Sequence, residues 1–164
     1  SAAERDQRHG PGQPRDYIFA VPPSPMVSRV LVPMDDSEMA RGALEYALSE
    51  HPAAEITVLH VVGGPSPMMG AAASVALSEE FEENAREHAN VVFDRAREIA
   101  EEHDREIDTE LAFGNAARAI VEHAEGFDTV VIGTHSGSLS DRLFTGNVAE
   151  KVFRRCPVPV TAVR

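Results

Sequence analysis

The sequence is poor in cysteine, lysine and tryptophan, and it lacks long apolar runs. Cys156 is the only cysteine among 164 residues, so no disulfide can form within the chain and no thiolate cluster can hold a metal ion. No apolar run approaches the roughly 20 residues that cross a bilayer, and the N-terminal residues lack the apolar core of a signal peptide. These absences lead us to expect a soluble, cytoplasmic protein with no membrane partner.

Negative charge dominates the composition. The 27 Asp and Glu residues outnumber the 15 Lys and Arg residues, the formal net charge is −12, and Lys151 is the only lysine. This balance disfavours binding to nucleic acid or to an anionic membrane surface. Many acidic side chains with almost no lysine resemble proteins of halophilic, salt-loving microbes, in which salt screens the charge repulsion. We favour this interpretation over that of an ordinary acidic protein.

The first 25 residues differ in composition from the rest. They are polar, contain glycine and proline, and end near the proline-rich segment VPPSP. Such a segment cannot bury enough apolar surface to offset its loss of chain entropy. We predict a flexible extension over 1–25 and one globular domain over 26–164.

Strand-like and helix-like patterns alternate through the domain. Short apolar runs predict five strands, and longer segments with apolar residues on one face predict four helices. Ser37 and Ser78 are expected N-caps, and the segment 63–77 is expected to be a long loop because it is rich in small residues, Gly and Pro. The expected strands span 27–32, 55–62, 107–113, 128–133 and 158–163, and the expected helices span 37–49, 78–103, 116–124 and 147–155.

This alternation predicts a mostly parallel sheet with helices on both faces. Ligands of such sheets bind outside the carboxyl ends of the strands, where the strand order reverses. In the common order 3-2-1-4-5 this point lies between the first and fourth strands. It would place Asp35 and Asp36 opposite Gly133. For Asp36 and Ser37 we favour helix capping, and for Asp35 a role in the site.

The loop that follows the fourth strand, GTHSGSLSDRLFTGN, has features of a phosphate-binding loop. Glycines let backbone N–H groups approach a phosphate, and the N-terminus of the next helix adds unpaired donors and partial positive charge. Gly133, Gly137 and Gly146 meet the first need, and the helix that opens at Asn147 meets the second. Three glycines in a connection are common, so spacing alone leaves two alternatives, a phosphate cradle or a plain strand-to-helix connection.

Three segments of the chain together resemble one protein family. These are RVLVPMDDSEMARGALEYAL followed by TVLHVV, then FGNAARAIVEHAEGFDTVVIGTHS, and the C-terminal GTHSGSLSDRLFTGNVAEKVFRRCPVPVTAV. They are similar to the universal stress protein family, and the resemblance covers 27–164. It implies a flavodoxin-like, HUP-type, doubly wound five-stranded parallel sheet of order 3-2-1-4-5 with helices on both faces.

The resemblance also implies a homodimer. The family usually dimerises through antiparallel pairing of the last strands, which would cover an exposed apolar edge. In this chain the pairing residues would be Val158, Pro159, Val160, Thr161, Ala162 and Val163.

Members of the family that bind ATP carry the pattern G-x2-G-x9-G-(S/T) in the loop after the fourth strand. Here Gly133 and Gly146 match, Ser136 occupies the middle glycine position with Gly137 one residue late, and Asn147 replaces the Ser/Thr. The resemblance implies ATP or AMP as ligand, with Mg²⁺ if a triphosphate binds. The implied nucleotide-binding residues are Pro33, Met34, Asp35, Val61, Gly133, Ser136, Gly137, Gly146, Asn147 and Val148.

Two functions stay open on these residues. One is a stress-response regulatory module that binds ATP or AMP between the first and fourth strands. The alternative is a nucleotide-independent dimeric interaction module with a degenerate phosphate loop. A phospho-acceptor receiver domain is disfavoured because no Asp ends the third strand, and no hydrolase elbow or metal-ligand spacing is present. We therefore expect no dedicated enzyme and no metal site, with slow ATP hydrolysis left open.

Overall fold

The computed structural model describes residues 27–63, 71–134 and 147–164, with side chains from Glu79 onward in the second helix and from Val148 onward in the last. The predictions made for 1–25, and those made for Ser136, Gly137 and Gly146, lie outside the described residues. None of the helices in the described residues is long and apolar enough to cross a membrane.

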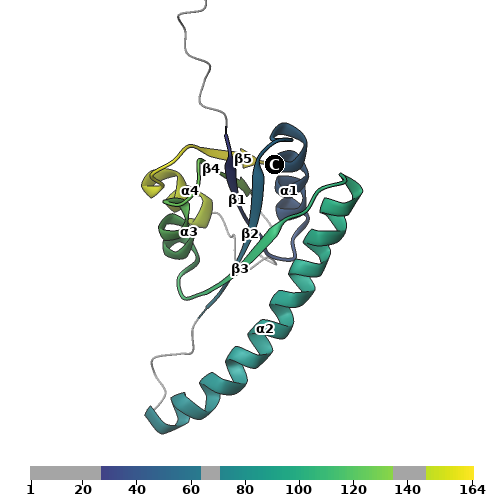
Figure 1. Cartoon of the computed structure of the whole chain (residues 1–164). Coiled ribbons are helices and arrows are strands. Elements are labelled where there is room, and N and C mark those ends of the chain that lie inside the picture. The colour runs from purple at the N-terminus through teal and green to yellow at the C-terminus, as the bar shows by residue number, and fades with distance from the viewer. Residues whose placement is uncertain (1–26, 64–70, 135–146) are drawn as a thin grey trace, which may run out of the picture.

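Five parallel strands form the centre of the molecule (Figure 1). Their order is β3-β2-β1-β4-β5, which confirms the predicted fold. Buried β-branched and leucine side chains occupy β1, β2 and β4, as expected of strands covered on both faces. The strands span Arg29–Pro33 (β1), Glu55–Val62 (β2), Asp108–Phe113 (β3), Thr129–Gly133 (β4) and Val160–Val163 (β5).

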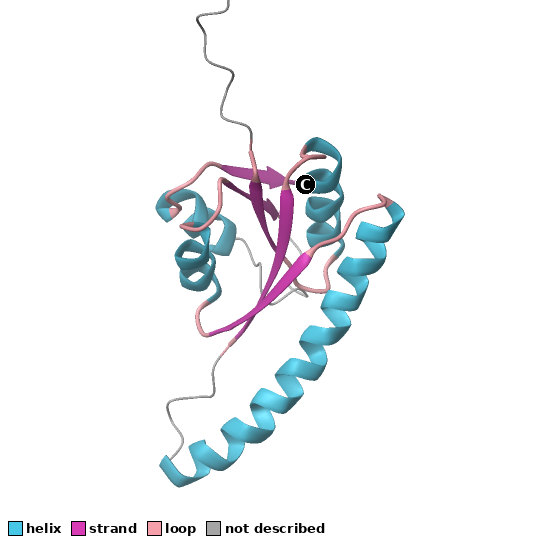
Figure 2. Cartoon of the chain, in the orientation of Figure 1, coloured by secondary structure: helices cyan, strands magenta, loops and turns pink. Residues whose placement is uncertain are grey.

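Four helices cover the two faces of the sheet, with α1 and α2 on one side and α3 and α4 on the other (Figure 2). Each side has its own buried apolar cluster, one containing Val32, Leu44 and Val92 and the other containing Leu59, Ile120 and Val152. The N-terminal part of α2 extends beyond the edge of the sheet (Figure 1). The helices span Glu38–Glu50 (α1), Ala71–Glu102 (α2), Ala116–Ala124 (α3) and Asn147–Arg155 (α4).

Most predicted elements agree with the structure within two residues, but the start of α2 was wrong. The helix begins at Ala71, so the predicted loop 63–77 is helical from residue 71 and Ser78 lies inside the helix rather than capping it. The segment AAASVAL that opens the helix is rich in alanine, the residue with the highest helix propensity. The glycines and prolines that suggested a loop all lie in 63–70.

The start of β1 is fixed to the turn before β4. The Asp128 carboxylate accepts hydrogen bonds from the backbone N–H groups of Ser28 and Arg29, each at 2.9 Å. These bonds lower the pKa of Asp128 below its ordinary value. The Arg29 guanidinium donates to the carbonyl of Gly126 at 2.6 Å and lies 4.6 Å from the centre of the Phe127 ring. Strands distant in sequence are thereby held in register.

The end of α1 is stabilised by an arginine that follows α2. The last turn of α1 carries no basic residue. The Arg105 guanidinium instead donates to the carbonyls of Leu48 at 3.1 Å, His51 at 3.3 Å and Ala54 at 2.6 Å. It satisfies acceptors that a helix end leaves unpaired and adds positive charge where the helix dipole is negative.

Replacing Arg105 with methionine should lower the free energy of unfolding by about 1–3 kcal/mol, because partly buried carbonyls lose a charged donor. Urea denaturation followed by circular dichroism measures this difference. Arg95→Met is the matched control, since Arg95 makes an exposed ion pair with Glu98 at 3.6 Å and should change stability by less than about 1 kcal/mol. Equal effects of the two substitutions would contradict this role of Arg105.

Candidate functional site

The strand order reverses between β1 and β4, and the candidate site lies at the carboxyl ends of these strands. The two strands pair at Val30 with Thr129 and at Leu31 with Val130. One connection leaves β1 toward β2 and another leaves β4 toward β5, so the loops diverge and open a crevice, as in other sheets of this type. The structure brings together the end of β1, the end of β4 and the first turn of α1.

Gly133, the last residue of β4, packs against the backbone of α1. A Cβ placed on Gly133 would lie 2.9 Å from the backbone nitrogen of Ala40 and would overlap the carbonyl of Met39. Backbone atoms cannot move aside as the end of a flexible side chain can. Gly133 is therefore needed for the close approach of strand and helix, a reason that is independent of any ligand.

The segment between β1 and α1 caps the helix. Ser37 is the N-cap as predicted, and its hydroxyl accepts from the N–H of Ala40 at 3.2 Å. Asp36 is exposed and pairs with Arg41 at 3.2 Å. Asp35 is only 6% exposed, and its Oδ1 accepts from the N–H of Ser37 at 2.9 Å. The backbone N–H of Ser37, two residues further along, thus orients the Asp35 carboxylate at the end of β1.

Met34 joins the end of β1 to β2 through two hydrogen bonds. Its N–H donates to the carbonyl of Leu59 at 2.8 Å. Its carbonyl oxygen accepts from Nδ1 of His60, also at 2.8 Å. Because a carbonyl can only accept, Nδ1 of His60 carries the hydrogen and Nε2 holds a lone pair. The geometry fixes one tautomer of His60.

His60 is almost fully buried, and Nε2 has no hydrogen-bond partner among the residues that the structure describes. Burial lowers the pKa of His60 below its ordinary value, and the bond to the Met34 carbonyl opposes this shift. The nearby His88 lowers the pKa further, whereas the charge of Asp35 raises it. An unpaired buried nitrogen is costly in a folded protein, so this atom calls for an explanation.

Val61 lies on β2 beyond the point at which β1 ends. β2 pairs with β1 only as far as Leu59 but continues along β3 to Val62. In a parallel sheet the backbone groups of alternate residues point to the same neighbouring strand. The N–H and C=O of Val61 therefore face the same side as those of Leu59, toward the space past the end of β1. Its side chain is buried against the cluster beneath α3 and α4.

The remaining predicted residues are placed only in part. Pro33 ends β1 and is buried. Asn147 is the first residue of α4, where the helix was predicted to open, and Val148 is half-buried against the same cluster as Val61. The structure assigns packing contacts to Val148 and gives it no further role.

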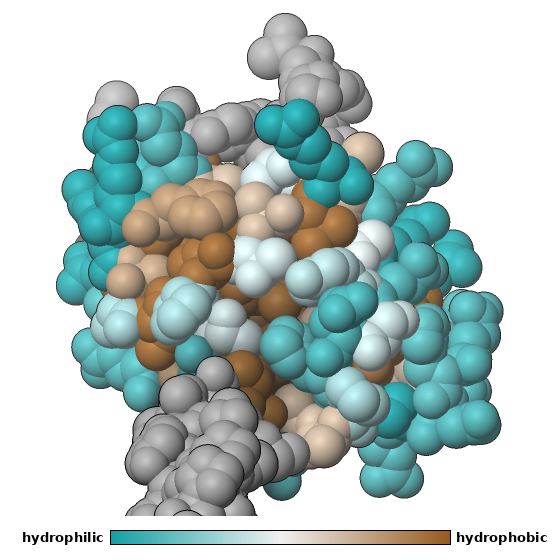
Figure 3. All heavy atoms as spheres, turned by 90° about the horizontal axis from the view of Figure 1, so that it is seen from above, coloured by the Kyte–Doolittle hydropathy of each residue, from teal (hydrophilic) through white to brown (hydrophobic). Residues whose placement is uncertain are grey.

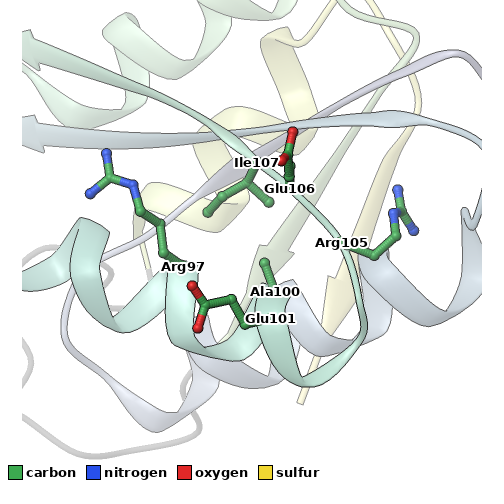
Figure 4. A pocket seen from close by; sticks show the side chains of 6 residues that line it. All are labelled: Arg97, Ala100, Glu101, Arg105, Glu106 and Ile107. Carbon is green, nitrogen blue, oxygen red and sulfur yellow. The ribbon is translucent and has the colours of Figure 1, made fainter.

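A cavity of about 210 Å³ lies elsewhere, between the end of α2 and the start of β3 (Figure 4). Its arginines point away from each other in Figure 4 and are already bonded, Arg105 to backbone carbonyls and Arg97 to Asp94 and Thr109. This cavity therefore supports no ligand of defined chemistry. It is lined by Arg97, Ala100, Glu101, Arg105, Glu106 and Ile107.

An open α/β sheet with a crevice at its switch point defines a broad class of ligand-binding folds. Within it, this chain belongs to the universal stress protein family, whose model matches residues 26–164. The chain is 30% identical over 151 residues to universal stress protein YxiE of Bacillus subtilis, covering 85% of this chain and 100% of that protein. It is 29% identical over 143 residues to universal stress protein MJ0531 of Methanocaldococcus jannaschii, and the match covers 85% of this chain and 83% of that protein.

Solved structures share the fold. Universal stress protein UspA from Lactobacillus plantarum superposes with a TM-score of 0.70 at 24% identity over 86% of this chain and 100% of that one. Similar folds also occur in a universal stress protein in complex with cAMP (TM-score 0.61), in one from Archaeoglobus fulgidus with dAMP (0.60) and in one from Arabidopsis thaliana with AMP (0.57). These three are 21%, 18% and 15% identical to this chain and cover 85%, 85% and 83% of it. The chain covers 98%, 99% and 90% of their lengths.

Gly133→Ala should lower the free energy of unfolding by about 1–3 kcal/mol without any nucleotide present, because the new Cβ overlaps the α1 backbone. Gly42→Ala is the matched control: Gly42 lies inside α1 with nothing within 4 Å of a Cβ, so alanine there should raise stability by about 0.5–1 kcal/mol. Thermal unfolding of both variants measures the two effects. A Gly133→Ala protein as stable as the parent would contradict the described packing.

Proposed function

We propose that this protein is a stress-response regulatory module that binds an adenine nucleotide at the carboxyl ends of β1 and β4. The observation that carries the proposal is that β2 continues past the end of β1, so that the backbone of Val61 faces the space beyond the strand end that carries the buried carboxylate of Asp35. The known complexes of family members with cAMP, dAMP and AMP support adenine nucleotides as the ligand class.

Each part of a nucleotide has a chemically suited partner at this end of the sheet. The N–H and C=O of Val61 offer one donor and one acceptor, which suits the edge of an adenine ring. The Asp35 carboxylate can accept hydrogen bonds that the ribose hydroxyls would donate. The N-terminus of α4, at Asn147, has N–H groups without partners inside the helix and a partial positive charge, and both favour phosphate. ATP or AMP fits this set, with Mg²⁺ accompanying a triphosphate.

The proposal includes a homodimer formed through the last strand. β5 lies at one edge of the sheet, with Ala162 exposed and Val160 and Val163 half-buried. Figure 3 views the molecule from above the orientation of Figure 1 and shows an apolar area bordered by hydrophilic side chains. An unpaired apolar edge strand favours pairing with another strand, and a second copy of β5 supplies one.

We assign the protein a regulatory role in the cytoplasm rather than a catalytic one. At the strand ends, the Ser37 hydroxyl accepts from the N–H of Ala40 and the Asp35 carboxylate accepts from the N–H of Ser37, so both side chains organise the turn that opens α1. The 27 acidic residues against 15 basic ones suit a cytoplasm of high salt concentration, which would screen their repulsion.

Asp35→Asn should weaken AMP and ATP binding about tenfold, roughly 1.4 kcal/mol, because a charged acceptor becomes a neutral amide. Isothermal titration calorimetry in high salt measures this change. Asp36→Asn is the matched control, since the neighbouring Asp36 is exposed and turned to Arg41, and it should leave affinity unchanged. Equal losses in both variants would argue against contact between nucleotide and Asp35.

The nucleotide-independent alternative has its own test. If the parent binds neither AMP nor ATP, the double substitution Ser136→Gly and Asn147→Ser restores the family's pattern in the loop. Binding that appears only in this double variant would establish that the phosphate loop of the parent is degenerate. The protein would then act as a dimeric interaction module, and its function would lie at the β5 surface.

A further inference from the structure

We propose that His60 and His88 form a binding site for a divalent transition-metal ion of the Zn²⁺ type, on the α2 side of the sheet. This inference concerns different side chains from those of the nucleotide proposal. It rests on one buried unpaired nitrogen, on the bond that orients it and on the second imidazole beside it.

His60 has the arrangement that metal-ligating histidines show. Such histidines donate one ring N–H to a carbonyl or carboxylate, which fixes the tautomer and directs the other nitrogen to the metal. Nδ1 of His60 donates to the Met34 carbonyl at 2.8 Å, so Nε2 presents a lone pair. Nε2 is buried and has no partner in the described part of the chain. A metal ion would supply the interaction that this atom lacks.

His88 provides the second ligand. It lies on α2 with its ring centre 5.6 Å from that of His60 and the ring planes inclined at 55°. Two imidazoles that bind one ion through nitrogens about 2.0–2.1 Å from it have ring centres roughly 5–6 Å apart. His88 is exposed, so the site borders solvent on the side of α2.

The surroundings favour a cation with an incomplete protein shell. Phe93 lies edge-on to His60 at 6.4 Å between ring centres and restricts water on that side. Asp35 is near enough for its negative charge to act on His60. In the described residues no three His, Cys, Asp or Glu side chains gather closely enough to hold a metal, so water completes the coordination. Imidazole nitrogens select Zn²⁺, Co²⁺, Ni²⁺ or Cu²⁺ over Mg²⁺ and Ca²⁺.

Co²⁺ and Zn²⁺ titrations of the full chain test this site. Bound Co²⁺ should give a visible absorption band. One Zn²⁺ ion per chain should displace the Co²⁺ and abolish this band, whereas Mg²⁺ should not displace the Co²⁺. His88→Gln should weaken Zn²⁺ binding at least tenfold, and because His88 is exposed the variant should fold like the parent. His51→Gln, which removes an imidazole at the end of α1, should leave the affinity unchanged.

A second readout identifies His60 without mutating a buried residue. In nitrogen-15 spectra of the histidine rings, Zn²⁺ should shift the Nε2 signal of His60 and leave Nδ1 protonated. Unchanged Zn²⁺ affinity in His88→Gln, or Zn²⁺ binding with no shift of the His60 signal, would overturn the proposal. Absence of Zn²⁺ or Co²⁺ binding below millimolar concentration would overturn it as well.

Discussion

The close approach of β4 to the first turn of α1 is the constraint on which the candidate site depends. Gly133 has no Cβ, so the strand end lies directly against the backbone of Met39 and Ala40. This contact holds the N-terminus of α1 beside the switch point, and the capping segment with Asp35 follows from it. The first turn of α1 therefore lies at the carboxyl ends of β1 and β4.

Much of the fold could be predicted because local patterns and tertiary structure agree. Buried parallel strands appear as short apolar runs, and Ser37 signals the start of α1 by its capping chemistry. The start of α2 could not be predicted in this way, since AAASVAL is both small-residue-rich and strongly helical. The family resemblance, rather than residue patterns alone, supplied the strand order and the nucleotide hypothesis.

The strand order predicted where the candidate site lies, but the contacts within it could be predicted only in part. Asp35 was expected in the site and its neighbours Asp36 and Ser37 as helix caps, whereas in the structure one Asp35 oxygen accepts from the N–H of Ser37 and Asp36 pairs with Arg41. The pairing of His60 with His88 depends on how α2 crosses the sheet, so their separation of 28 positions in the sequence carries no signal. The two proposed sites adjoin at Met34 and Asp35, where β1 ends.

The nucleotide content of freshly purified protein shows whether the chain binds an adenine nucleotide. The protein would be prepared in high salt, denatured and analysed by chromatography for released adenine nucleotides. We expect near-stoichiometric AMP or ATP per chain. Empty protein that also gains no thermal stability from added AMP, or from ATP with Mg²⁺, would contradict it, because any ligand that binds only the folded state must stabilise that state.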